Sequence, residues 1–238
     1  MSVLSVQGLE KKFKAAKVET VLKGLCLELH PGDIFCLFGA NGSGKTTFLR
    51  TLLSIYPAEK GVVRFFDSPF SPSIKKRIGY LEDKAIDFPF LKVREFVDLS
   101  LKLYGFDRRE RKPLIHASLE RVGLLSNKEK FLNALSRGME RRLGLAELIS
   151  HDPELFIMDE PLEGLDLEGM IFFQHFLTEC RERKRCILLT THLYAGVKDF
   201  ATRVGVLHDG KIVEYPAQDF DFKKLSDFIL SIRGGRKP

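Results

Sequence analysis

The stretch that decides the fold lies between an apolar run over residues 34–38 and a helix-like segment over residues 47–53, and reads Gly39-Ala40-Asn41-Gly42-Ser43-Gly44-Lys45-Thr46. In the spacing G-x-x-x-x-G-K-T, backbone N–H groups wrap a phosphate chain, Lys45 reaches the β- and γ-phosphates, and the Thr46 hydroxyl takes a Mg²⁺ position. The positive end of the helix dipole strengthens this attraction for anions. A flexible glycine loop with a solvated lysine is the weaker alternative, because the flanking strand and helix match the context of the motif. The sequence therefore predicts a nucleotide-phosphate site made of Gly39, Asn41, Gly42, Ser43, Gly44, Lys45, Thr46 and Thr47.

Length and composition bound what the chain can be. It has 238 residues, 44% of them hydrophobic, which is enough for one domain with a proper core, with or without an attached lobe. The N-terminus has neither a basic region nor a long apolar region, so we expect no signal peptide. No apolar run approaches the roughly 18 residues of a membrane-spanning helix, so any membrane work is expected of another chain.

Charge and cysteine usage point to an ordinary reduced protein. The formal net charge is +6, with basic clusters at residues 75–77, 108–112 and 181–185. Such clusters are usually solvated helix faces; attraction to an anionic membrane surface is a second interpretation and nucleic-acid binding a weaker one. We interpret the cysteines as reduced, mostly packing residues of a cytosolic protein, with metal binding less favoured, because no C-x-x-C pair occurs among Cys26, Cys36, Cys180 and Cys186.

Strand-like and helix-like segments alternate along most of the chain. Strand patterns occupy residues 3–6, 21–29, 34–38, 62–66, 77–81, 155–158, 186–190 and 204–207. Helical periodicity runs from residue 93 to about 148, and returns at 167–182 and in a final segment around 222–232. Residues 208–211 have hairpin-turn chemistry. This alternation predicts a mainly parallel sheet with helices on both faces and an inserted helical lobe.

A second chemical feature is the apolar strand at residues 155–158, which ends in the carboxylates Asp159 and Glu160. The carboxyl end of a parallel strand presents such groups near a phosphate loop. Asp159 would then hold the Mg²⁺ shell, and Glu160 could polarise an attacking water as general base. A solvated turn or a helix cap is the structural alternative.

Upstream, Leu135-Ser136-Arg137-Gly138-Met139 opens a helix, with Ser136 as its predicted N-cap. Free amides around Gly138 face any approaching anion. A serine-glycine helix start shortly before an apolar strand ending in Asp-Glu resembles the ATP-binding cassette (ABC) family. The match to that family's LSGGQ signature is partial, because Arg137 and Met139 replace glycine and glutamine. The form LSRGM is similar to the variant common in cassettes that serve ABC-2-type exporters.

This resemblance covers nearly the whole chain and implies a fold class. That class is α/β: a P-loop NTPase with a mainly parallel central sheet, an N-terminal antiparallel β-subdomain and an inserted α-helical subdomain. The expected organisation is one ABC ATPase domain over residues 1–238. Residues 1–92 and 151–238 would form its core with the β-subdomain, and residues 93–150 its helical subdomain.

Further site residues follow from the resemblance by position. Phe13 resembles the aromatic residue that stacks on adenine, although an ordinary core phenylalanine is the alternative in a chain with 20 of them. Gly164-Leu165-Asp166 resembles the D-loop, which crosses the dimer interface in the family. His192, at the end of an apolar strand, resembles the switch histidine that contacts the γ-phosphate.

One departure from the family pattern concerns its Q-loop glutamine. Asp83, or less favourably Glu82, stands in that place. A carboxylate can still reach a Mg²⁺-bound water, which makes Asp83 a weak metal-shell candidate. It also adds repulsion near the γ-phosphate, so slower hydrolysis or altered coupling is the hypothesis.

The resemblance implies an ATP hydrolase with ATP and Mg²⁺ as cofactors, located in the cytoplasm on the inner face of the cell membrane. Two copies, in a homodimer or heterodimer, would enclose ATP and drive a separate integral-membrane permease that docks on residues 83–104. No direct nucleic-acid binding is expected. The alternative is a non-transport ABC ATPase acting on DNA, ribosomes or a soluble assembly, and a P-loop kinase or GTPase is a more remote one.

Overall fold

The computed structural model describes residues 1–14, 18–83, 86–192 and 197–217. They form two compact units: the described parts of residues 1–70 and 186–217, and those of residues 71–185. The predicted final helix at 222–232 lies outside the described residues. No helix among the described residues has both the length and the apolar character needed to cross a bilayer.

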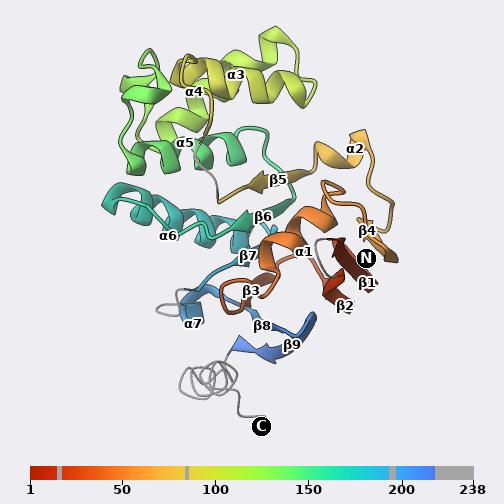
Figure 1. The fold of residues 1–238 in the computed structure, drawn as a ribbon. Coiled ribbons are helices and arrows are strands. Elements are labelled where there is room, and N and C mark those ends of the chain that lie inside the picture. The colour runs from red at the N-terminus through yellow and green to blue at the C-terminus, as the bar shows by residue number, and fades with distance from the viewer. Residues whose placement is uncertain (15–17, 84–85, 193–196, 218–238) are drawn as a thin grey trace. The chain divides into compact units, whose positions relative to one another are not determined.

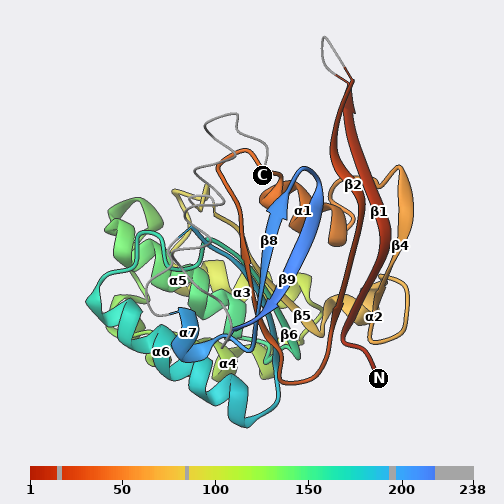
Figure 2. The same cartoon turned by 90° about the horizontal axis from the view of Figure 1, so that it is seen from below.

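The first unit contains an antiparallel sheet in the order β2-β1-β4, formed by β1 (Leu4–Lys14), β2 (Val18–Leu29) and β4 (Lys60–Phe65). Figure 2 shows the long β1–β2 ribbon with β4 alongside. Both long strands exceed the predicted runs at 3–6 and 21–29, so those predicted bounds are wrong. The reason is irregular pairing: the register shifts between Val6 and Leu9 and again before Glu10, and Gly8 has a φ of 61°. Such bulges interrupt the alternation from which strand lengths are inferred.

The same unit holds β3 (Ile34–Phe38), α1 (Lys45–Leu52), β7 (Cys186–Thr190), α7 (Val197–Phe200), β8 (Arg203–His208) and β9 (Lys211–Pro216). Strand β3 pairs in parallel with β7 on one side and β8 on the other, and β9 adds an antiparallel edge to β8. All residues of β3 and β7 are buried, as continuous apolar runs predict for parallel strands. The hairpin at 208–211 is confirmed, with φ of 46° at Asp209 and 73° at Gly210.

The second unit pairs β5 (Ile78–Leu81) in parallel with β6 (Leu155–Asp159). Its helices are α2 (Pro72–Lys75), α3 (Val93–Leu103), α4 (Arg108–Arg121), α5 (Arg137–Ile149) and α6 (Leu167–Glu182), with 3₁₀ turns at Leu125–Asn127 and Leu132–Ala134. Figure 1 shows α3, α4 and α5 grouped as a helical lobe, in agreement with the helical periodicity of residues 93–148.

The core of this lobe is built from the predicted apolar faces. Val93, Val97 and Leu101 of α3 and Leu119 of α4 are fully buried. Phe96 of α3 is only partly buried, because it lines a surface cleft described below.

The cysteines are free thiols. Cys36, Cys180 and Cys186 are buried, and burial raises the pKa of the Cys180 thiol to about 12. Cys26 is exposed, which agrees with the prediction that most, not all, of the cysteines are packing residues. No group of three or more His, Cys, Asp or Glu side chains suited to a metal ion occurs in the described part of the chain.

Candidate functional site

The glycine loop of the first unit has the backbone geometry of a phosphate cradle. Gly42 and Gly44 have φ of 81° and 102°, in the region that favours glycine. A Cβ on Gly44 would also lie 2.7 Å from Cγ1 of Val21. Gly44 is the N-cap of α1 and supplies no side-chain cap, so the first amides of α1 receive none from it. The loop therefore has the backbone conformation in which a glycine-rich loop directs amides toward an anion.

Two side chains of the loop support the same interpretation. Lys45 is buried, and its Nζ donates a hydrogen bond of 2.9 Å to the Gly39 carbonyl, across the loop. The Ser43 Oγ is buried and has no hydrogen-bond partner among the described residues. A buried hydroxyl without a partner costs free energy unless a ligand satisfies it. The donors present thus fit a phosphate chain.

His192 lies at the same edge of the first unit as the glycine loop. Thr190 of β7 is the register partner of Leu37 of β3, and the Thr191 amide donates to the Leu37 carbonyl at 3.2 Å. His192 and Gly39 each follow these partners by two residues. Because the two strands are parallel, their carboxyl ends coincide, and the exposed His192 lies beside the cradle.

Phe13 lies near the end of β1 and is 36% exposed. Its ring meets Tyr56 edge to face with centroids 5.5 Å apart, and the Lys11 ammonium lies 5.1 Å from its centroid. It is therefore not an enclosed core residue. Its stacking on adenine stays a prediction.

The carboxylate pair stands at the carboxyl end of β6 in the second unit. Asp159 is 1% and Glu160 9% exposed. Since β5 and β6 are parallel with Leu81 opposite Met158, Glu82 and Asp83 leave the sheet at the same edge. Glu160 has a φ of 46°, which is unusual for a residue with a side chain and is found where surrounding contacts impose it.

Arg141 of α5 joins these two strand ends. Its guanidinium donates to the carbonyls of Glu82 and Asp159, each at 3.0 Å, and to the carbonyl of Glu160. Burial raises the pKa of the Asp83 carboxyl, and the neighbouring charges of Glu163, Asp159 and Glu160 act in the same direction while Arg141 opposes them. Sequence reasoning missed Arg141, because a second arginine in a charged helix has no distinctive spacing.

The signature helix and the D-loop are in contact within the second unit. Ser136 is the predicted N-cap of α5 and accepts from the Met139 amide at 3.2 Å. A Cβ on Gly138 would lie 2.6 Å from Oδ2 of Asp166, so only glycine fits there. Asp166 caps α6 through the Gly169 amide at 2.9 Å and pairs with Nε of Arg142 at 3.2 Å. The sequence predicted these motifs separately; the structure joins them.

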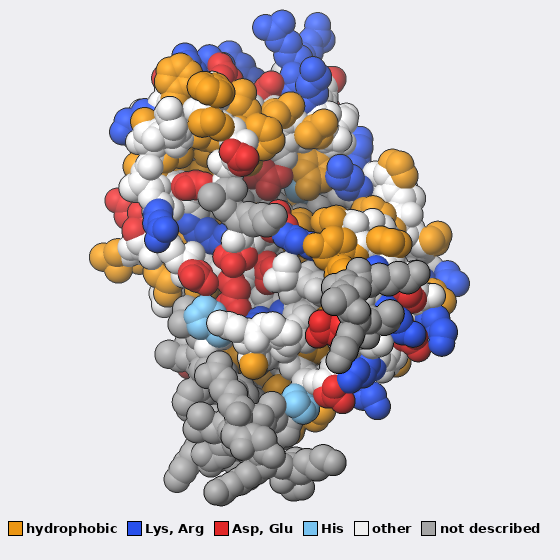
Figure 3. Space-filling view, in the orientation of Figure 1, with side chains coloured by type: hydrophobic (Ala, Val, Ile, Leu, Met, Phe, Trp, Pro, Cys, Tyr) orange, Lys and Arg blue, Asp and Glu red, His pale blue; other side chains and the backbone are white. Residues whose placement is uncertain are grey.

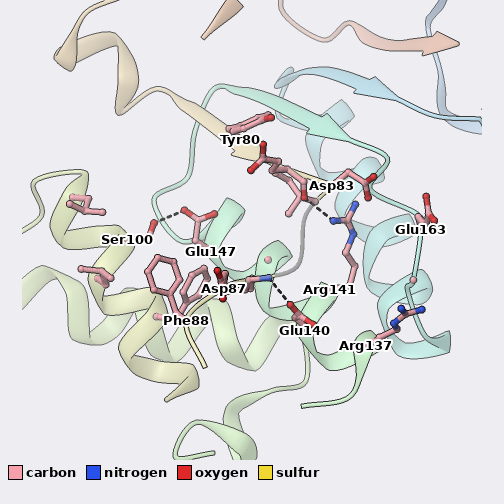
Figure 4. Close-up of a pocket in the computed structure, with 18 residues that line it drawn as sticks. Tyr80, Asp83, Asp87, Phe88, Ser100, Arg137, Glu140, Arg141, Glu147 and Glu163 are labelled. Carbon is pink, nitrogen blue, oxygen red and sulfur yellow. Dashed lines mark hydrogen bonds between the residues drawn. The ribbon is translucent and has the colours of Figure 1, made fainter. Parts of the chain in front are cut away.

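A cleft of about 750 Å³ opens in the second unit, and sequence reasoning did not predict it. In Figure 4, Asp83, Arg141 and Glu163 lie toward one end and Phe88, Ser100 and Glu147 toward the other. Figure 3 shows hydrophobic and acidic side chains side by side over this part of the surface. Phe88 and Leu103, which line the cleft, are 49% and 70% exposed. The cleft therefore offers apolar contacts next to negative charge.

The inner end of the cleft holds an acidic group in an unfavourable setting. Glu147 of α5 accepts a hydrogen bond from the Ser100 hydroxyl of α3. Burial raises the pKa of the Glu147 carboxyl to about 7, although the Ser100 hydroxyl and the charge of Lys75 favour the ionised form. Both protonation states of Glu147 are thus populated near neutral pH.

The fold and the glycine loop define a nucleotide-binding domain of the P-loop class. A family profile described as ABC transporter matches residues 22–163. The chain belongs to the ABC transporter family, and the predicted resemblance and fold class are both confirmed.

Similar proteins carry transport names. The chain is 34% identical over 200 residues to an uncharacterized ABC transporter ATP-binding protein of Synechocystis sp., covering 83% of this chain and 56% of that protein. It is 32% identical over 216 residues to the bacitracin transport ATP-binding protein BcrA of Enterococcus faecalis, covering 89% and 68%. The ABC transporter ATP-binding protein NatA of Bacillus subtilis is 28% identical, with 83% and 82% covered. The chain thus spans little more than half the length of some relatives and most of others.

Solved structures confirm the fold. An ATP-binding subunit of an ABC transporter has a TM-score of 0.83 at 20% identity, covering 96% of this chain and 99% of that one. A dimeric, post-hydrolysis ATP-binding cassette bound to ADP and phosphate has a TM-score of 0.78 at 23% identity, covering 91% and 100%.

Replacing Lys45 with alanine should weaken ATP binding by about 10- to 100-fold, since a charged hydrogen bond contributes about 1.5 to 3 kcal/mol. The measurement is titration with a fluorescent ATP analogue. Lys60→Ala, which removes an exposed lysine of β4, is the matched control and should bind as the unaltered chain does. If Lys45→Ala binds ATP as tightly as the unaltered chain, the glycine loop is not the phosphate site.

Glu147→Gln should change how stability depends on pH. The folded pKa of about 7 exceeds the ordinary 4.5, so the unaltered chain loses stability as pH rises from about 4.5 to 7. Glutamine keeps an acceptor for Ser100 without this loss. The difference in unfolding free energy between the variant and the unaltered chain should therefore increase by about 2 kcal/mol from pH 5 to pH 8, as one pKa unit corresponds to about 1.4 kcal/mol. Urea unfolding at both pH values measures it; a difference independent of pH contradicts the assignment.

Proposed function

We propose that this chain binds ATP in the loop formed by Gly39, Asn41, Gly42, Ser43, Gly44, Lys45, Thr46 and Thr47. The observation that carries the proposal is the buried Ser43 hydroxyl without a partner beside the buried Lys45, in a loop of positive-φ glycines. A nucleotide phosphate chain would satisfy these donors together. Phe13, partly exposed, would stack on the adenine.

Mg²⁺ would accompany the nucleotide and neutralise charge on the phosphate oxygens. The residues proposed to hold it are Thr46 and Asp159, with Asp83 as a weaker candidate in the water shell. Their oxygen donors suit a hard cation.

Hydrolysis is proposed to depend on Glu160 and His192. Glu160 would orient and deprotonate the attacking water, and His192 would contact the γ-phosphate. The parallel registers of β5–β6 and of β3–β7 support this, since Glu160 and His192 each leave a buried strand at its carboxyl end.

Two copies would complete each site. Ser136, Gly138 and Asp166 would face the ATP of a partner subunit, in a homodimer or a heterodimer. The dimeric state of the similar cassette bound to ADP and phosphate supports this arrangement. The close fit of Gly138 against Asp166 would let the signature helix and D-loop act as one surface.

The work is proposed to be transport through a separate integral-membrane permease, with this chain peripheral on the cytoplasmic face of the membrane. The permease would dock on residues 83–104, where the cleft combines exposed Phe88 and Leu103 with acidic Asp87 and Glu147. Such a surface suits an amphipathic segment with a basic side chain. The transport names of BcrA and NatA support this partner over a nucleic acid or a soluble assembly.

Glu160→Gln should lower turnover to a small residual rate while keeping ATP binding, so that an ATP-bound dimer accumulates. Ser136→Arg should block dimer formation and hydrolysis without weakening ATP binding to the monomer. Size-exclusion chromatography with ATP and a phosphate-release assay separate these outcomes. Normal turnover by Glu160→Gln would show that Glu160 is not the general base. Equal loss of ATP binding and hydrolysis in Ser136→Arg would refute the site shared between two subunits.

Leu103→Asp should release the chain from membranes of cells that contain its transport system, because a charge in the cleft removes apolar contact with the permease. Washed membranes and supernatant are compared by immunoblot. Ile171→Asp, at a side chain of α6 that is 48% exposed, is the control and should stay with the membranes. If both variants stay with the membranes equally, the permease does not dock on this cleft.

A further inference from the structure

The first half of α5 carries the signature residues and also contacts the residues that follow β5. Ser136 and Gly138 open the helix as the signature. The Glu140 carboxylate accepts from the Ile86 amide at 2.6 Å, and Arg141 donates to the Glu82 carbonyl at 3.0 Å. Glu82 and Ile86 are thus each held by one of two successive side chains of α5.

The other contacts of Arg141 lead to the carboxylate pair. Its Nη2 donates to the carbonyls of both Asp159 and Glu160, the residues at the end of β6. These bonds hold the backbone and leave the carboxylates to other contacts. They fix the backbone at the point where Glu160 adopts its positive φ of 46°. A positive φ at a residue with a side chain costs of order 1 to 3 kcal/mol and persists only where surrounding contacts hold it.

Electrostatics explain why an arginine occupies this place. The Arg141 guanidinium lies within the field of the carboxylates of Asp83, Asp159, Glu160 and Glu163. Its planar fork can serve carbonyls on two strand ends at once, which a point-like ammonium does less well. Burial lowers the pKa of Arg141, which nonetheless stays protonated at any working pH because an arginine is a very weak acid.

We propose that Arg141 is a positioning residue for Glu160. Arg141 ties the backbone of the proposed general base to the backbone of Glu82, which lines the proposed docking cleft. This inference rests on the proposed ATPase function. A shift of the Glu82 backbone would move Glu160 through a single side chain. The asymmetry of the contacts supports the role, since Nη1 serves the exit of β5 and Nη2 the end of β6.

The test is steady-state ATP hydrolysis by Arg141→Met, Arg141→Lys, Glu160→Gln and the double variant Arg141→Met/Glu160→Gln. Arg141→Met should lower kcat by about 10- to 100-fold with KM for ATP within about threefold, because misplacement of a reacting group by about 1 Å has effects of this size. Arg141→Lys should restore part of kcat. In the Glu160→Gln background, Arg141→Met should change the residual rate by less than about twofold, because residues acting through one another are not additive.

Arg121→Met is the matched control, since Arg121 pairs with Glu179 at the surface, away from these contacts. It should retain the kcat of the unaltered chain. Full kcat in Arg141→Met, or an equal fold-loss with and without Glu160, would overturn the inference. If Arg141→Met does not fold, Arg141→Lys decides: a lower kcat at unchanged KM supports the role, and full kcat at unchanged KM refutes it.

The two levels of hypothesis fail differently. Loss of activity in Glu160→Gln together with full activity in Arg141→Met overturns only the positioning role. Full activity in Glu160→Gln overturns the proposed base, and the role of Arg141 falls with it.

Discussion

The rest of the structure depends on the parallel pairing of buried strands. Within each unit, this pairing brings the carboxyl ends of strands that are far apart in the sequence to one edge of the sheet. In the first unit, the register of β3 with β7 sets His192 beside the glycine loop. In the second, the register of β5 with β6 sets Asp83 next to Asp159 and Glu160. Parallel strands need long crossovers, so residues far apart in sequence become neighbours.

Helix α5 adds a second level of organisation to the second unit. Its cap serves the signature, its next turn serves both strand ends, and its later residue Glu147 reaches the cleft. The signature, the strand-end contacts of Arg141 and the cleft therefore share one helix, which is the continuous packed element that coupling between them would require. This arrangement is the structural basis for the proposed coupling between a docked permease and the proposed hydrolytic residues.

Sequence reasoning succeeded where a motif depends on local chemistry. The glycine loop, the Ser136 cap and the hairpin at 208–211 are set by residues within a few positions of one another. It failed at the long β1–β2 ribbon, whose bulges break the alternating pattern, and at Arg141. Arg141 donates hydrogen bonds to the carbonyls of Glu82 and Glu160, which are far from it in the sequence. No local sequence pattern predicts such bonds.

By itself the sequence determined the family, the α/β class, a glycine-rich loop between a strand and a helix, a carboxylate pair at the end of a buried strand and the Ser136 cap of a helix. Only the tertiary structure decided that Gly138 packs on Asp166, that a cleft opens beside Phe88 and Glu147, and that one guanidinium holds two strand ends. The reason is physical: local propensity and spacing fix turns, caps and loops, whereas clefts and side-chain bridges exist only after packing has fixed the separation of distant segments.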